Sequence, residues 1–275
     1  MATELAKAAP PPYAATTDTP PVYLPEGSAA AAPDPNETLD PAVFTLHGRF
    51  VYPQLPSGEP DSEPVYQLSR AIHTQGRATE TIEFQRLDPR VRTAHDDGSP
   101  VVFRHAKDVY VLRHQNPMHY AGIPFSARLL PCSRKTLGEV AIEKSPLFHH
   151  GYRAMKVVSD EERVALERKG VKVKKGEYHF VMKEGQGEET WLWSDTTGRA
   201  LASQVCEAPA TEGDEAQYKL KVLVPLSRRV RDGLVATWCL WMWHLHIEKT
   251  TVRKTWEDRK RILHQPRRLD HAGIF

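Results

Sequence analysis

The segment LVATWCLWMWHL, residues 234–245, decides the fold of this chain. Three tryptophans fall within six positions, and on a helix Trp238 and Trp241 share one face while Trp243 points well away from them. Apolar residues therefore cover nearly the whole circumference, and the helix must be buried on almost every side. The run stops well short of the roughly 20 apolar residues that a membrane span needs. We expect a core helix over residues 230–248.

A narrow polar stripe interrupts this helix. Thr237, His244 and Glu248 fall within roughly 40° of one another at helical spacing. We expect His244 to be a hydrogen-bonded core histidine. Cys239 lies inside the apolar run, which favours a small buried residue. The three cysteines are far apart in the sequence and form neither a disulfide framework nor a metal-ligand spacing.

Short runs of strand composition fill most of the chain before this helix. Within residues 79–86, Ile82, Phe84 and Arg86 alternate with polar residues, a period of two that breaks at its end. Residues 101–104 and 109–112 predict a hairpin with its turn at 105–108. One internal helix is predicted at 159–169. The remaining predicted strands are 50–52, 65–72, 129–130, 140–142, 152–158, 177–182, 189–193, 199–206 and 218–224.

Strands that recur every 8–15 residues with short polar turns indicate antiparallel pairing. Strands can surround a helix completely only by closing into a barrel, which also removes exposed sheet edges. We therefore predict a mainly β (α+β) fold: a closed antiparallel β-barrel of about 10–12 strands over residues 43–250, threaded by the helix at 230–248.

Composition indicates a tail at each end. Residues 1–42 are rich in alanine and proline and predict a disordered segment, whereas 251–275 predict a basic polar helix and tail. The formal charge of +2 argues against a nucleic-acid partner. Without an apolar N-terminal signal segment, we expect a cytoplasmic protein, peripheral to a membrane or nuclear if the basic C-terminal clusters act as an address.

The strand–turn–helix at 220–224, 225–227 and 232–245 resembles the tubby C-terminal-like fold, shared by tubby, LURP-one-related proteins and phospholipid scramblases. Residues 65–90 and 144–157 are also similar to a group of uncharacterised fungal proteins. The resemblance implies a closed barrel around a hydrophobic helix. Tubby-type domains bind phosphoinositides through surface lysines and arginines. No residue of that site aligns with this chain, and scramblase features are met only in the proline-rich tail.

Two basic clusters are candidate anion or phosphate sites, because ammonium and guanidinium groups bind phosphate oxygens. The alternative for each is a solvated charged face. The candidate residues are Lys172, Lys174, Lys175, Arg228, Arg229 and Arg231.

No catalytic, metal or cofactor motif is present: the chain lacks GxSxG, a P-loop, GxGxxG, CxxC and HExxH. Asp195, Asp232 and Glu189 are not paired by any spacing. We therefore expect no metal or cofactor, and a non-catalytic module that binds anionic lipid headgroups or phosphorylated ligands. The alternatives are an adaptor that binds a protein partner through the proline-rich tail, and an enzyme or small-ligand carrier that uses the barrel mouth.

Overall fold

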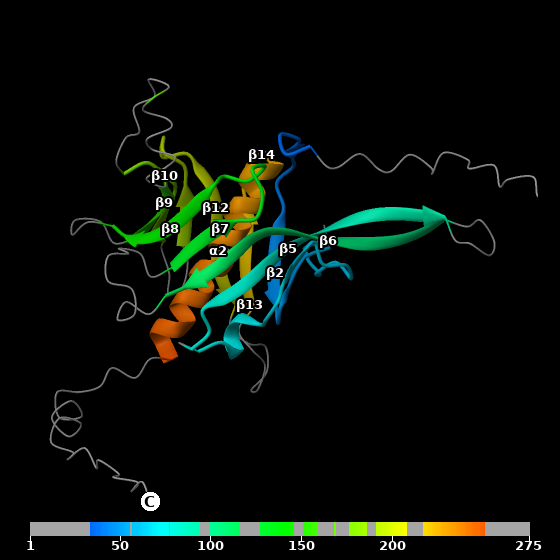
Figure 1. Ribbon diagram of the computed structural model, residues 1–275, viewed down its shortest axis with the longest axis horizontal. Helices are drawn as coiled ribbons and strands as arrows, with labels where there is room; N and C mark the ends of the chain where they lie inside the picture. The colour runs from blue at the N-terminus through cyan, green and yellow to red at the C-terminus, as the bar shows by residue number, and fades with distance from the viewer. Residues whose placement is uncertain are drawn as a thin grey trace, which may run out of the picture. The chain divides into compact units, whose positions relative to one another are not determined.

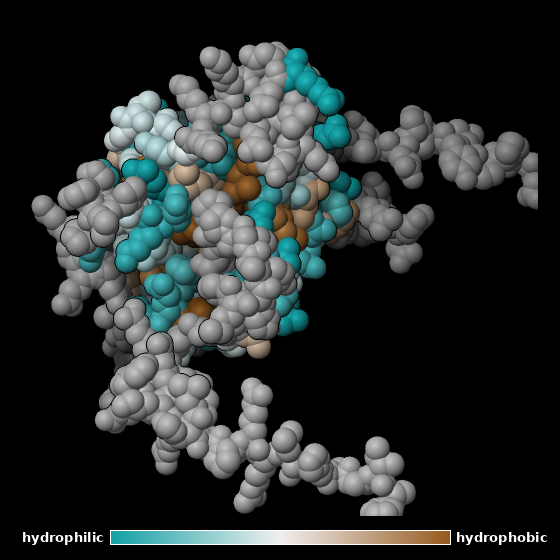
Figure 2. Space-filling view, turned by 60° about the vertical axis from the view of Figure 1, so that its left-hand side comes forward, coloured by the Kyte–Doolittle hydropathy of each residue, from teal (hydrophilic) through white to brown (hydrophobic). Residues whose placement is uncertain are grey.

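Twelve strands close into a barrel around one long helix (Figure 1). The computed structural model describes residues 34–55, 57–76, 78–93, 100–115, 127–145, 151–158, 168, 176–185, 191–207 and 217–250. The helix predicted at 159–169 (apart from residue 168), the tail at 251–275 and the first 33 residues lie outside this description. Figure 2 shows one face, on which hydrophilic residues cover much of the described surface and hydrophobic residues form narrow patches between them.

Every neighbouring pair in the barrel is antiparallel. The strands β2 to β13 follow one another around it in chain order, and the pairing of β13 with β2 closes the ring. The strands are β2 (Val43–His47), β3 (Phe50–Pro53), β4 (Tyr66–Leu68), β5 (Thr81–Thr93), β6 (Pro100–His114), β7 (Ala127–Pro131), β8 (Glu139–Lys144), β9 (Gly151–Val157), β10 (Tyr178–Glu184), β11 (Trp191–Ser194), β12 (Ala200–Glu207) and β13 (Gln217–Val222). The predicted closed barrel of 10–12 strands is confirmed.

The predicted hairpin with its turn at residues 105–108 is wrong. β6 runs through these positions without a break and pairs with β5 from Thr81↔Arg113 to Thr93↔Pro100. A register shift between Phe84 and Gln85 interrupts the ladder there instead. The polar residues at 105–108 lie where β6 leaves the barrel wall, so polarity reflects exposure and not a turn.

The helix α2 (Arg228–Thr250) occupies the barrel interior. Its residues from Asp232 to His244 are buried without a break, and Trp238, Trp241 and Trp243 have no exposed surface. Side chains from opposite walls touch it: Trp241 packs on β9 and β11, and Trp243 on β6. The predicted core helix is confirmed, with ends two residues beyond those expected. Among the described residues, no helix has the length and hydropathy of a bilayer-spanning segment.

Residues 34–42, which composition assigns to the N-terminal tail, are part of the structure. β1 (Thr38–Leu39) pairs with β14 (Leu226–Ser227), directly before α2. The carbonyl oxygens of Pro35 and Glu37 accept hydrogen bonds from the backbone N–H groups of Arg229 and Arg228, at 2.9 and 2.7 Å. The first N–H groups of a helix lack partners within it, so this segment supplies the helix with its cap.

Candidate functional site

A buried charged network lies at the barrel end where α2 begins. Arg86 on β5 donates two hydrogen bonds to Asp88, from Nε at 2.6 Å and Nη2 at 3.0 Å. Its Nη1 donates a third to Asp232 of α2 at 2.5 Å, and Asp232 also accepts from the Tyr66 hydroxyl at 2.8 Å. Arg86, Asp88 and Asp232 are each less than 10% exposed. The network therefore ties the helix to β4 and β5.

Burial and pairing act against each other in this network. Burial raises the pKa of Asp232, while the charge of Arg86 and the hydrogen bond from Tyr66 lower it, and the net shift is upward. Burial alone lowers the pKa of Arg86, but its hydrogen bonds to Asp88 and the charge of Asp232 raise it overall. Burial and the neighbouring Asp232 raise the pKa of Tyr66. The guanidinium of Arg86 thus offsets part of the cost of burying the Asp232 carboxylate.

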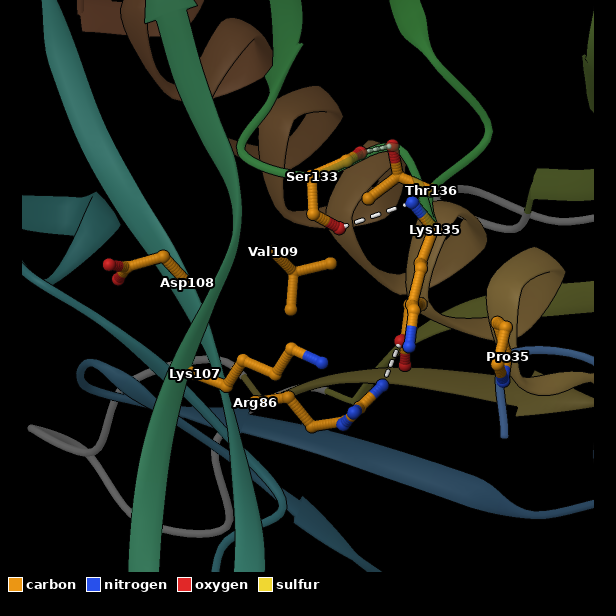
Figure 3. A pocket seen from close by; sticks show the side chains of 9 residues that line it. Pro35, Arg86, Lys107, Asp108, Val109, Ser133, Lys135 and Thr136 are labelled. Atoms are coloured by element: carbon orange, nitrogen blue, oxygen red, sulfur yellow. Dashed lines mark hydrogen bonds and ion pairs between the residues drawn. The ribbon is translucent and has the colours of Figure 1, made fainter. Parts of the chain in front are cut away.

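A small pocket that opens to solvent lies over this network. In Figure 3 the side chains of Arg86, Lys107 and Lys135 converge on it, whereas Asp108 points to the opposite side of its strand. Asp108 accepts a hydrogen bond there from Gln85 at 2.8 Å. Neither lysine ammonium has an ion pair with another residue that the structure describes, so both present free positive charge to the pocket.

The connection between β7 and β8 supplies the other wall of the pocket. The Ser133 hydroxyl oxygen accepts a hydrogen bond from the Lys135 backbone N–H at 3.3 Å, which leaves its hydrogen available to a ligand. Thr136 donates to the Ser133 carbonyl at 2.9 Å. The Leu137 N–H donates to the Tyr110 hydroxyl oxygen at 2.9 Å, and burial raises the pKa of Tyr110 to about 12. Tyr110 on β6 therefore fixes the connection that carries Lys135.

Two of the three arginines predicted as phosphate ligands are bound within the protein. Arg228 donates to the Glu37 carboxylate at 2.6 Å. Arg231 donates to the Asp40 carbonyl at 2.9 Å, with its guanidinium 5.2 Å from the centre of the Phe44 ring. The side chain of Arg229 is exposed. Arg228 and Arg231 thus bind the N-terminal segment, whereas Arg229 faces solvent.

The other predicted ligands, Lys172, Lys174 and Lys175, lie outside the described residues. The strands that flank them are described: β9 ends at Val157 and β10 begins at Tyr178. The ladders β10–β11, β11–β12 and β12–β13 place these two strand ends at the end of the barrel where α2 begins. The positive charge of Arg229 also contributes to the lowered pKa of His179, after burial and Lys156.

The opposite end of the barrel is filled by aromatic rings. Tyr152, Trp191 and Trp241 pack together with ring centroids 4.2–6.0 Å apart, and the His244 ring lies 5.7 Å from that of Trp241. His244 Nε2 is 3.5 Å from a carboxylate oxygen of Glu248, as the polar stripe predicts, and burial lowers the pKa of His244. These packed rings argue against a ligand carried inside the barrel.

No family model, curated protein or solved structure matches this chain. Within the described part of the chain, no three His, Cys, Asp or Glu side chains are grouped to hold a metal ion.

The sequence pattern contains one overlooked signal for this pocket. Arg86 occupies the third inward position after Ile82 and Phe84, so a charge replaces the apolar residue that alternation requires. An inward arginine in a barrel strand needs a buried carboxylate partner. The partner, Asp232, is distant in sequence, and Lys107 lies in the segment that the sequence misassigns to a turn.

Proposed function

We propose that this protein is a binding module for phosphate groups of anionic ligands, with inositol phospholipid headgroups as the class of ligand. The observation that carries the proposal is the convergence of Lys107 and Lys135 on a pocket floored by Arg86. Arg86 is matched by two carboxylates, Asp88 and Asp232, so the positive charge available to a ligand comes from the two lysines, less the one charge that offsets the second carboxylate. The Ser133 hydroxyl adds a neutral donor beside them.

The surroundings of the pocket support the same ligand class. The exposed Arg229 and the flanks of the segment that holds Lys172, Lys174 and Lys175 belong to this end of the barrel. Each lysine or arginine near an anionic surface adds about 1 kcal/mol to binding. A tubby-like relationship, which the closed barrel around a hydrophobic helix supports, would agree with phosphoinositide binding.

Calorimetric titration with soluble inositol trisphosphate and with inorganic phosphate tests this proposal. Replacing both pocket lysines, K107Q and K135Q, should weaken trisphosphate binding by at least about 30-fold, on the basis of at least about 1 kcal/mol for each charge-assisted hydrogen bond that is lost. The matched control is K183Q, because Lys183 is exposed on β10 near the far end of the barrel. Equal affinities for the double variant and the control would exclude the pocket as the phosphate site.

Vesicle sedimentation separates the possible sources of the phosphate. Binding to phosphatidylcholine vesicles that contain an inositol bisphosphate lipid, together with binding of the soluble trisphosphate, indicates a headgroup site. Affinity for inorganic phosphate alone indicates a general anion site. Binding to neither, at physiological salt, contradicts the proposal, because a site of this charge should retain part of its affinity there.

A further inference from the structure

The longest strand pair of the barrel extends beyond its wall. Residues 88–93 of β5 pair only with β6, and residues 100–108 of β6 pair only with β5, among the strands that the structure describes. We call residues 88–93 and 100–105 the ribbon. Figure 1 shows it projecting away from the remainder of the barrel. A two-stranded ribbon alone is marginally stable in water, so a partner surface would stabilise it.

One face of the ribbon continues the pocket. Side chains alternate along a strand, so Arg86 and Arg90 lie on the same face, roughly 13 Å apart. Their partners across the ladder are Lys107 and Phe103, and His105 lies between these two. Residues directly opposite in an antiparallel pair share a face. The intervening Asp88 is buried and bound to Arg86, so the exposed charge on this face is basic.

The face also presents an exposed aromatic ring. Phe103 is 41% exposed and lies opposite Arg90, which is also exposed. Exposed aromatic rings combined with basic residues are typical of segments that settle at a bilayer interface, where the ring enters the headgroup region and the charges meet anionic lipids. Nucleic-acid-binding domains tend to have an isoelectric point above about 9, whereas that of this chain is about 8.4.

We infer that the ribbon is a membrane-contacting arm, which lays Arg90, His105 and Phe103 on an anionic bilayer while the pocket holds a phosphate headgroup. The inference rests on the proposed phosphate site and adds a second contact to it. The other face of the ribbon is fastened to the barrel at its base, because Arg104 forms an ion pair with Glu63 and donates to the Leu87 carbonyl at 3.4 Å. Arg104 thus links the base of the arm to the connection between β3 and β4.

The test compares vesicle binding with binding of the soluble headgroup. F103S should weaken binding to vesicles of phosphatidylcholine and phosphatidylserine by on the order of tenfold, and R90A by about fivefold. Both variants should bind soluble inositol trisphosphate as the unchanged chain does. L192S is the matched control for F103S, because Leu192 on β11 is also 41% exposed. K183A is the control for R90A.

The possible outcomes distinguish the arm from the pocket. Loss of vesicle binding in F103S and R90A, with trisphosphate binding intact, supports the arm, while the K107Q/K135Q variant separately tests the pocket on which the inference rests. Vesicle binding equal to that of the controls contradicts the arm and leaves the pocket standing. If R90A reduces binding to a DNA duplex and not to vesicles, the partner is a nucleic acid and the inference is wrong. Unchanged thermal unfolding of each variant shows that the fold is intact.

Discussion

Replacing Arg86 by methionine probes the network that joins α2 to the barrel. Arg86 donates three hydrogen bonds, at 2.5–3.0 Å, to two carboxylates that are themselves buried. Methionine fills similar space and carries no charge, so R86M leaves Asp88 and Asp232 buried together without their shared cation. Removing one partner of a buried ion pair typically costs 3–5 kcal/mol. We expect a loss of about 4 kcal/mol in the free energy of unfolding at pH 7.

The pH dependence of this loss makes the prediction specific. The charge of Arg86 is the largest influence that lowers the pKa of Asp232, so in R86M this pKa rises further above its unfolded value. A carboxyl group with a raised folded pKa favours the folded state when it is protonated, and that contribution is lost as pH rises through the folded pKa. The difference in stability between R86M and the unchanged chain should therefore shrink as pH falls from 7 to 5.

Urea unfolding followed by circular dichroism measures both quantities. R199M serves as the control, because Arg199 is exposed, and should change the free energy of unfolding by less than about 0.5 kcal/mol. A loss below about 1 kcal/mol for R86M at pH 7, or a loss that does not shrink at pH 5, would refute the proposed role of the network.

Three further changes test other contacts. Burial lowers the pKa of His244, so the folded state loses stability as pH falls below about 6.5, the ordinary pKa of histidine. In urea titrations, H244Q should therefore lose less free energy of unfolding between pH 7 and 5 than the unchanged chain. An equal loss of free energy in the two proteins contradicts this. A Cβ at Gly233 would lie 2.4 Å from Leu137 Cδ1, so G233A should destabilise the fold by a steric clash. In a double-mutant cycle, adding L137A should recover about 1–3 kcal/mol of the free energy of unfolding lost in G233A, whereas additive effects of the two changes would contradict the clash. A chain that starts at Pro41 should unfold about 2–5 kcal/mol more easily than one that starts at Asp34, because it lacks the hydrogen bonds that cap α2; equal stabilities would contradict the cap.

The fold was predictable because one segment imposes a strong requirement. A helix with tryptophans on opposite sides cannot be buried by one face of a sheet. Short alternating strands can enclose it by closing into a barrel. The burial of Trp238, Trp241 and Trp243 and the contact between His244 and Glu248 follow from helical spacing alone. These features depend on local periodicity, which a sequence displays directly.

The pocket was not predictable in the same way. Its residues come from the segment before β1, from β5, β6, the β7–β8 connection and α2, and only the tertiary fold brings them together. The sequence predicts a phosphate site at the basic cluster before α2, but Arg228 and Arg231 bind the N-terminal segment, a contact across about 190 residues of sequence. Composition also assigns residues 34–42 to a disordered tail. These residues are placed by their hydrogen bonds to the start of a helix far along the chain, which composition does not report.

Amide hydrogen exchange across α2 tests most directly whether this helix is enclosed by the barrel. We predict that peptides covering residues 232–244 exchange only through global unfolding, as slowly as the most protected peptides of the barrel strands. Fast exchange of these peptides while β5 to β9 stay protected would show that the helix lies open to solvent, and would contradict the architecture on which the pocket and the arm depend.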